Sequence, residues 1–116
     1  MTAQGHPYTI FRRASERGNL MVAEVVLRTE IDHPSLVDLL DLTALIAQKD
    51  PKRHARVSAR WLARWLDAAG DATIYDAGLA VSALQALGGR HHANSVATLR
   101  DMAEQATSRR GDRVLP

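Results

Sequence analysis

The stretch from Asp50 to Gly70 carries the signals of a complete helix, and it constrains the fold more than any other part of the chain. Asp50 is a residue type that caps helix N-termini, and Pro51 suits the first helical position. Gly70 can adopt the left-handed backbone conformation that ends a helix. Five basic residues and both tryptophans lie between these signals. The sequence therefore predicts one long amphipathic helix that must be packed against other helices.

The two sides of this helix differ in character at 100° per residue. One broad side, which we expect to face the core, comprises Ala55, Leu62, Trp65, Leu66 and Ala69. Four arginines fall on the opposite side within an arc of roughly 80°: Arg53, Arg56, Arg60 and Arg64. We therefore expect Trp65 to be buried and Trp61 to lie at the boundary, beside the arginines.

Composition limits the class of protein. A chain of 116 residues is predicted to form a single all-helical domain over 1–116, with 1–6 and 109–116 as loose tails. The chain has no cysteine, which excludes disulfides, thiol catalysis and Cys-ligated metals. It also lacks a signal-peptide pattern and a long apolar run, so we expect a cytoplasmic protein without membrane contact.

Capping residues and apolar periodicity predict about six helices. Their expected ranges are 7–17, 20–29, 35–49, 51–69, 74–87 and 91–107. Asn19 is a candidate N-cap, and Ser35–Asp38 and Thr73–Asp76 have the spacing of capping boxes. The helix over 74–87 is almost free of charge, and we therefore expect it to be the central, buried helix.

Ser35 and Thr73 each open a two-helix unit, and they lie 38 positions apart in the numbering. The chain should thus form three antiparallel αα-hairpins in a short right-handed superhelix, with a compact helical bundle as the alternative. This pattern is similar to α-solenoid repeats of the tetratricopeptide or HEAT kind. The aromatic and glycine positions typical of tetratricopeptide repeats are missing, so the resemblance implies no site residues.

The sequence gives no support for an enzyme, a cofactor or a metal site. None of the histidine pairs has the i, i+4 spacing of a helical zinc site, although His54 could approach His91 or His92 if hairpins stack. Asp38 and Asp41 could do acid–base work, but acidic residues near a helix N-terminus are more often explained by the helix dipole. We expect no catalytic residues.

The arginine stripe is the candidate binding site, and it comprises Arg53, Arg56, Arg60, Trp61 and Arg64. An exposed aromatic ring beside arginines is typical of protein interfaces. We therefore predict a helical adaptor that binds a protein partner with an acidic surface, or a second copy of itself. Nucleic acid is the alternative partner, although the net charge is only +2 and no helix-turn-helix pattern is present. A solvated outer helix face would give the same pattern.

Overall fold

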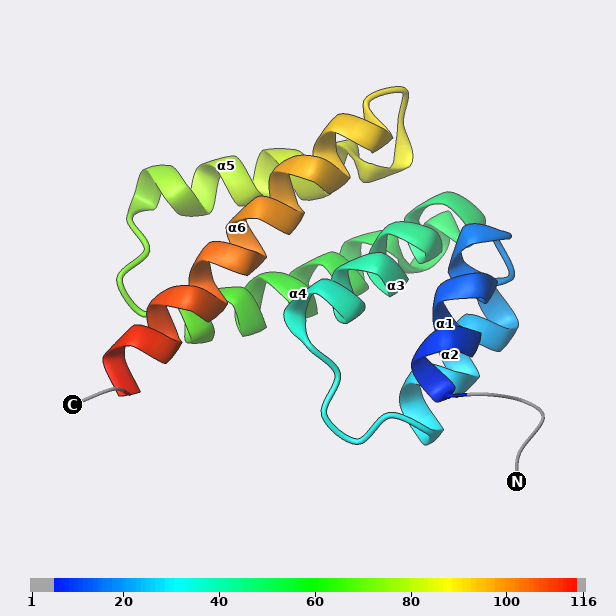
Figure 1. Cartoon of the computed structure of the whole chain (residues 1–116). Helices are drawn as coiled ribbons and strands as arrows, with labels where there is room; N and C mark the ends of the chain where they lie inside the picture. Colours follow the sequence, from blue (N-terminus) through cyan, green and yellow to red (C-terminus); the bar gives the residue numbers. More distant parts are fainter. Residues whose placement is uncertain (1–5, 115–116) are drawn as a thin grey trace.

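The computed structural model describes residues 6–114, and the side chains of 6–108, as an all-helical protein (Figure 1). Its elements are α1 (Pro7–Glu16), α2 (Leu20–Thr29), α3 (Leu36–Lys49), η1 (Pro51–Arg53), α4 (His54–Ala69), α5 (Ile74–Gln85), η2 (Ala86–Gly88) and α6 (His92–Val114). The two η segments are single turns of 3-10 helix. The predicted fold class, all-α with six helices, is confirmed.

The helix starts follow local capping chemistry. The Ser35 hydroxyl accepts a hydrogen bond from the Asp38 backbone N–H, and the Asp38 carboxylate accepts one from the Ser35 N–H. Thr73 and Asp76 repeat this reciprocal pair at the start of α5. Asn19 caps α2 through the N–H of Val22. Each contact satisfies backbone donors that the first helical turn would otherwise leave free.

The prediction for Asp50 was wrong. Its side chain accepts no capping hydrogen bond, and Pro51 opens the 3-10 turn η1 instead of α4. The α-helix begins only at His54, three residues later than the sequence signals indicated. Proline fixes its own φ but does not fix whether the next turn is 3-10 or α. The end of α4 is as predicted, with Gly70 at a φ of 70°.

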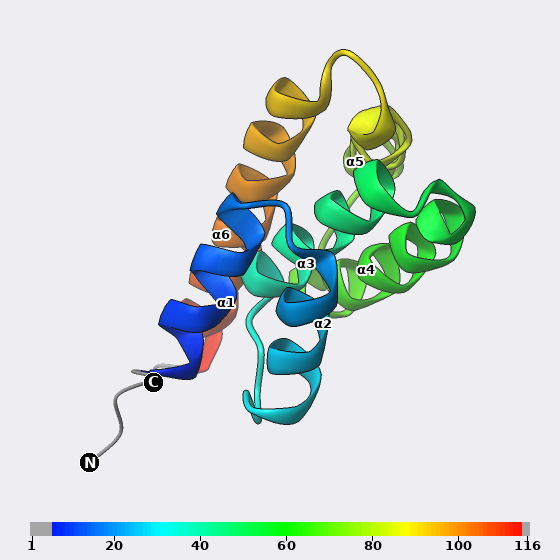
Figure 2. The ribbon, with the colours of Figure 1, turned by 90° about the vertical axis from the view of Figure 1, so that its right-hand side faces the viewer.

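Consecutive helices pack in pairs, α1 with α2, α3 with α4 and α5 with α6. This pairing is consistent with the three predicted hairpins. In addition, α6 packs on both α3 and α4 (Figure 2). The molecule measures 44 × 40 × 20 Å, so it is a slab about two helix diameters thick. In a slab this thin, every helix has at least one side near solvent.

Two apolar clusters hold the slab together. The larger one lies between α3, α4, α5 and α6 and includes Leu40, Trp65, Leu84 and Leu99. The smaller one joins α1 and α2 to α3 and to Val57 of α4. Helix α3 contributes to both clusters. It therefore links the N-terminal pair of helices to the rest of the protein.

Helix α5 is not the central helix that its composition predicted. It lies at an edge of the molecule in Figure 1. Ala80, Ala83 and Leu84 are buried, but Ile74 and Tyr75 are each 89% exposed. Lack of charge shows that a helix is compatible with burial, whereas the number of neighbours available decides how much of it is buried. The apolar outer side of α5 remains uncovered.

Helix α6 is longer than predicted. It continues to Val114, so residues 109–114 are helical and do not form the expected loose tail. His6, at the other expected tail, caps α1 by accepting a hydrogen bond from the Tyr8 N–H. The remaining tail residues, 1–5 and 115–116, lie outside the described residues.

Candidate functional site

The buried side of α4 runs through Val57, Trp61, Trp65 and Ala69. Trp61 is only 1% exposed and Trp65 is 4% exposed. The Trp61 indole N–H donates to the Leu36 carbonyl oxygen at 2.9 Å, and that of Trp65 donates to the Met102 carbonyl oxygen at 3.2 Å. The expected boundary position of Trp61 was therefore wrong, and its ring is not a stacking surface.

The buried side is rotated toward Trp61 because α3 packs against that edge of α4. At the opposite edge, Ala55 and Leu66, which were predicted to face the core, are exposed. The apolar residues of α4 cover a wider arc than one neighbouring helix can bury. Sequence periodicity cannot tell which edge of such an arc the neighbours cover.

Arg53 does not belong to a free basic face. Its guanidinium forms a two-pronged ion pair with the Glu24 carboxylate of α2, with Nη1 and Oε1 3.0 Å apart. Arg28 also contacts Glu24, at 2.8 Å. A carboxylate held by two guanidinium groups ties the start of α4 to α2. Arg53 therefore has a structural contact within its own chain.

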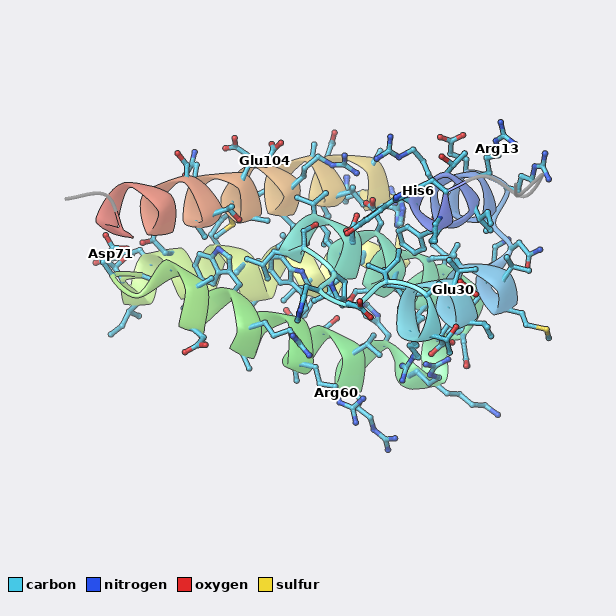
Figure 3. The ribbon with its side chains drawn as sticks, turned by 60° about the horizontal axis from the view of Figure 1, so that its bottom comes forward. His6, Arg13, Glu30, Arg60, Asp71 and Glu104 are labelled. Carbon is cyan, nitrogen blue, oxygen red and sulfur yellow. The ribbon has the colours of Figure 1, made fainter. Side chains whose placement is uncertain are left out.

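The other three arginines of the stripe remain available. Arg56, Arg60 and Arg64 are exposed, and within the described part of the chain none of them forms an ion pair. Figure 3 shows Arg60 on the outer side of α4. The predicted stripe is thus divided into one paired arginine and three free ones.

Two of the free arginines line a groove of about 240 Å³ between α2, α3 and α4. Its lining residues are Leu27, Arg28, Pro34, Leu39, Leu42, Thr43, Ile46, Val57, Arg60, Trp61 and Arg64. Arg28 lies on the α2 side, and Arg60 and Arg64 lie on the α4 side. The groove therefore has mostly apolar lining residues between an arginine of α2 and two arginines of α4. We call it the basic groove.

The sequence stripe identified Arg60 and Arg64 but missed the rest of the basic groove. Arg28, Pro34 and the leucines come from α2, α3 and the loop between them. Their approach to α4 depends on tertiary packing, which no local spacing encodes. Arg56 lies on α4 but outside the groove. It therefore offers a matched control for charge changes at the groove.

The ion pair between Arg53 and Glu24 changes the pKa of the Glu24 carboxyl. The hydrogen bond from Arg53 is the largest influence on Glu24, and together with the nearby positive charges it lowers the pKa of that carboxyl below 4.5. A lowered folded-state pKa means that Glu24 stabilises the fold above its unfolded pKa. This stabilisation is lost as pH falls through the folded pKa.

Replacing Glu24 by Gln should therefore reduce stability in a pH-dependent way. We expect Glu24→Gln to lower the free energy of unfolding by about 1 kcal/mol at pH 7. The difference from wild type should shrink below the ordinary glutamate pKa of 4.5, where the stabilisation by Glu24 fades. Urea unfolding at pH 7 and at pH 3 measures this. Glu30→Gln is the control, because Glu30 is exposed and has no ion pair among the described residues. A constant deficit at both pH values would contradict the electrostatic role.

The other candidate residues have structural partners. His54 Nε2 donates to the Leu84 carbonyl oxygen at 2.7 Å, and His92 Nδ1 donates to that of Leu87 at 2.6 Å. The two histidines thus make separate contacts with the α5–η2 segment. No group of three or more His, Cys, Asp or Glu side chains within the described residues is placed to hold a metal ion.

A second cleft, of about 300 Å³, lies between α1, α3 and α6 and contains Asp38 and Asp41. Asp38 belongs to the capping box of α3. Asp41 forms an ion pair with Arg100 at 2.8 Å, while burial raises the pKa of Asp41. Both carboxylates are thus engaged within the chain. The basic groove, with its free charges, is the stronger candidate site.

Comparisons of the chain with protein-family models, with curated proteins and with solved structures found no match. Among the described helices, none has the length and apolar character needed to cross a membrane. The function must therefore be inferred from the site itself.

Proposed function

We propose that this chain is a non-enzymatic helical binding protein that holds an acidic segment of a protein partner in the basic groove. The observation that carries the proposal is the pair of free guanidinium groups, Arg60 and Arg64, beside an apolar floor. Guanidinium groups recognise carboxylates in a geometrically specific way, and an apolar floor adds the burial that a charged contact lacks. The occupant should therefore carry Asp or Glu next to Leu or Ile.

The groove also suits a protein segment better than a nucleic acid. Single-stranded nucleic acids are usually held by aromatic rings on which bases stack, and both tryptophans are buried. The apolar lining includes the partly exposed Pro34 and Leu39, which have no counterpart to contact in a phosphate backbone. If the arginine stripe were only a solvated outer helix face, no apolar groove would be expected beside it.

Selection from a library of random 12-residue peptides tests the proposal. We expect the selected peptides to be enriched in acidic and branched apolar residues. Binding should weaken at least about tenfold for the double variant Arg60→Glu/Arg64→Glu, equivalent to about 1.4 kcal/mol. Arg56→Glu makes half of that charge change, on the same helix outside the groove, and it should alter the dissociation constant by less than about threefold.

Two results would overturn the proposal. One is a selection without acidic enrichment, and the other is full binding by the double variant. Titration with a labelled duplex and a single strand at low salt tests the nucleic-acid alternative. Affinity that falls log-linearly with salt, with a slope that Arg56→Glu and Arg60→Glu reduce equally, would favour phosphate binding instead.

A further inference from the structure

The outer side of α5 is an apolar surface that the chain does not cover. Ile74 and Tyr75 are 89% exposed, and Leu79 is 53% exposed. Val81 and the neighbouring Leu66 of α4 are also exposed. No charged residue occurs between Asp76 and Arg90. Solvated helix faces normally carry charges, so this composition indicates a surface that is buried in another state of the protein.

A groove of about 360 Å³ lies beside this surface, between α4 and α5. Its lining residues are His54, Ala55, Ser58, Ala59, Leu62, Val81, Leu84 and Gln85. His54 is held by its hydrogen bond to Leu84, and the other lining side chains are small, apolar or neutral. We call this groove and the outer side of α5 together the α4–α5 face.

The middle of the exposed side of α5 carries small residues and is therefore recessed. Gly78 lies between the larger exposed residues in the sequence, and a Cβ placed there would meet nothing within 4 Å. Ser82 follows one helical turn later on the same side. Small residues at this spacing let a second helix approach closely. The α4–α5 face thus has a ridge of large side chains, a shallow centre and a groove.

We propose that two copies of this chain associate through the α4–α5 face in a two-fold symmetric dimer. In a two-fold interface the same patch meets itself, so it must offer both a projection and a recess. The α5 ridge of one copy can occupy the α4–α5 groove of the other. A surface without charge can also meet its own copy without like-charge repulsion, which a charged face cannot.

The exposed area supports a dimer of modest affinity. The five exposed apolar side chains present roughly 500 Å², because an aromatic side chain offers about 150–250 Å² when fully exposed and the four aliphatic ones, three of them only partly exposed, offer less. The groove walls raise this toward the roughly 800 Å² per partner that a stable interface buries. A patch of this size is at the upper limit for a monomer.

The α4–α5 face and the basic groove use opposite edges of α4. Arg60 and Arg64 line the groove shared with α2 and α3, whereas Ala55 and Ala59 line the groove shared with α5. Dimerisation would therefore leave the arginines accessible. Failure of the dimer would not affect the proposed peptide binding, and the reverse also holds.

Gly78→Glu tests the dimer because it should change two properties in opposite directions. Glutamate is a better helix former than glycine by roughly 0.5–1 kcal/mol, so the folded monomer should become more stable. The same substitution places a charge at the centre of the symmetric contact, where it meets its own copy. The dissociation constant of the dimer should therefore rise at least about tenfold.

Sedimentation equilibrium from roughly 1 to 300 µM gives the dissociation constant, and urea unfolding at the lowest of these concentrations gives the monomer stability. Met21→Glu is the matched control, since Met21 is an apolar residue of α2 that is 77% exposed and lies outside the α4–α5 face. It should leave the dimer intact. Wild-type protein that stays monomeric, or that grows beyond a dimer without limit, would overturn the proposal. So would dissociation by Met21→Glu, or an intact dimer with Gly78→Glu.

Discussion

Trp61→Ala is expected to lower the free energy of unfolding by about 3–5 kcal/mol, as much as Trp65→Ala. Both indoles are almost fully buried on the same side of α4, and each N–H donates to a backbone carbonyl oxygen of another helix. Removing either ring leaves a large cavity and removes a hydrogen bond between two helices. Denaturant titration followed by circular dichroism measures both losses, and it does not depend on tryptophan emission.

Trp61→Phe separates the packing of the ring from its hydrogen bond. Phenylalanine keeps most of the buried area but cannot donate to Leu36, so we expect a loss of about 1–3 kcal/mol. A Trp61→Ala loss below about 1 kcal/mol would contradict its burial and restore the boundary position that helical periodicity predicted.

Leu99→Ala should cost about 2–5 kcal/mol, whereas Leu66→Ala should cost less than about 1 kcal/mol. Leu99 of α6 is completely buried in the larger apolar cluster, which α3, α4, α5 and α6 form together. Leu66 belongs to α4 but lies on its exposed edge. The same chemical change therefore creates a closed cavity at Leu99, whereas at Leu66 it removes a side chain that is 40% exposed and leaves a space open to water.

Urea unfolding at low micromolar concentration is the appropriate measurement, because self-association through the α4–α5 face would add to the apparent role of Leu66. Equal losses at the two positions would show that the exposed edge of α4 is covered in the monomer. That result would also weaken the case for a free α4–α5 face.

Local chemistry made much of this fold predictable. The capping boxes at Ser35 and Thr73, the cap at Asn19 and the glycine end at Gly70 involve only residues within one helical turn. Their geometry follows from side-chain length and backbone sterics, so the sequence defines it. The class, the number of helices and most of their bounds depend on such contacts.

Positions decided by tertiary packing were less predictable. The pattern of α4 is compatible with burial of either edge, and only the place of α3 selects Trp61 over Leu66. Likewise, α5 has a composition suited to a central helix but too few neighbours in this slab. The candidate site shows the same division. Its α4 arginines were found from their spacing, while Arg28 and the apolar floor come from helices distant in the sequence.

The position of Trp61 under the basic groove has a practical consequence. Its indole forms part of the groove floor, while Trp65 lies in a separate cavity between α4, α5 and α6. In a protein carrying Trp65→Phe, the remaining ring would be the sole source of indole emission. A segment entering the groove would bring charged groups close to that buried ring and so change its emission spectrum. The molecule thus contains an intrinsic optical reporter for occupancy of its own candidate site.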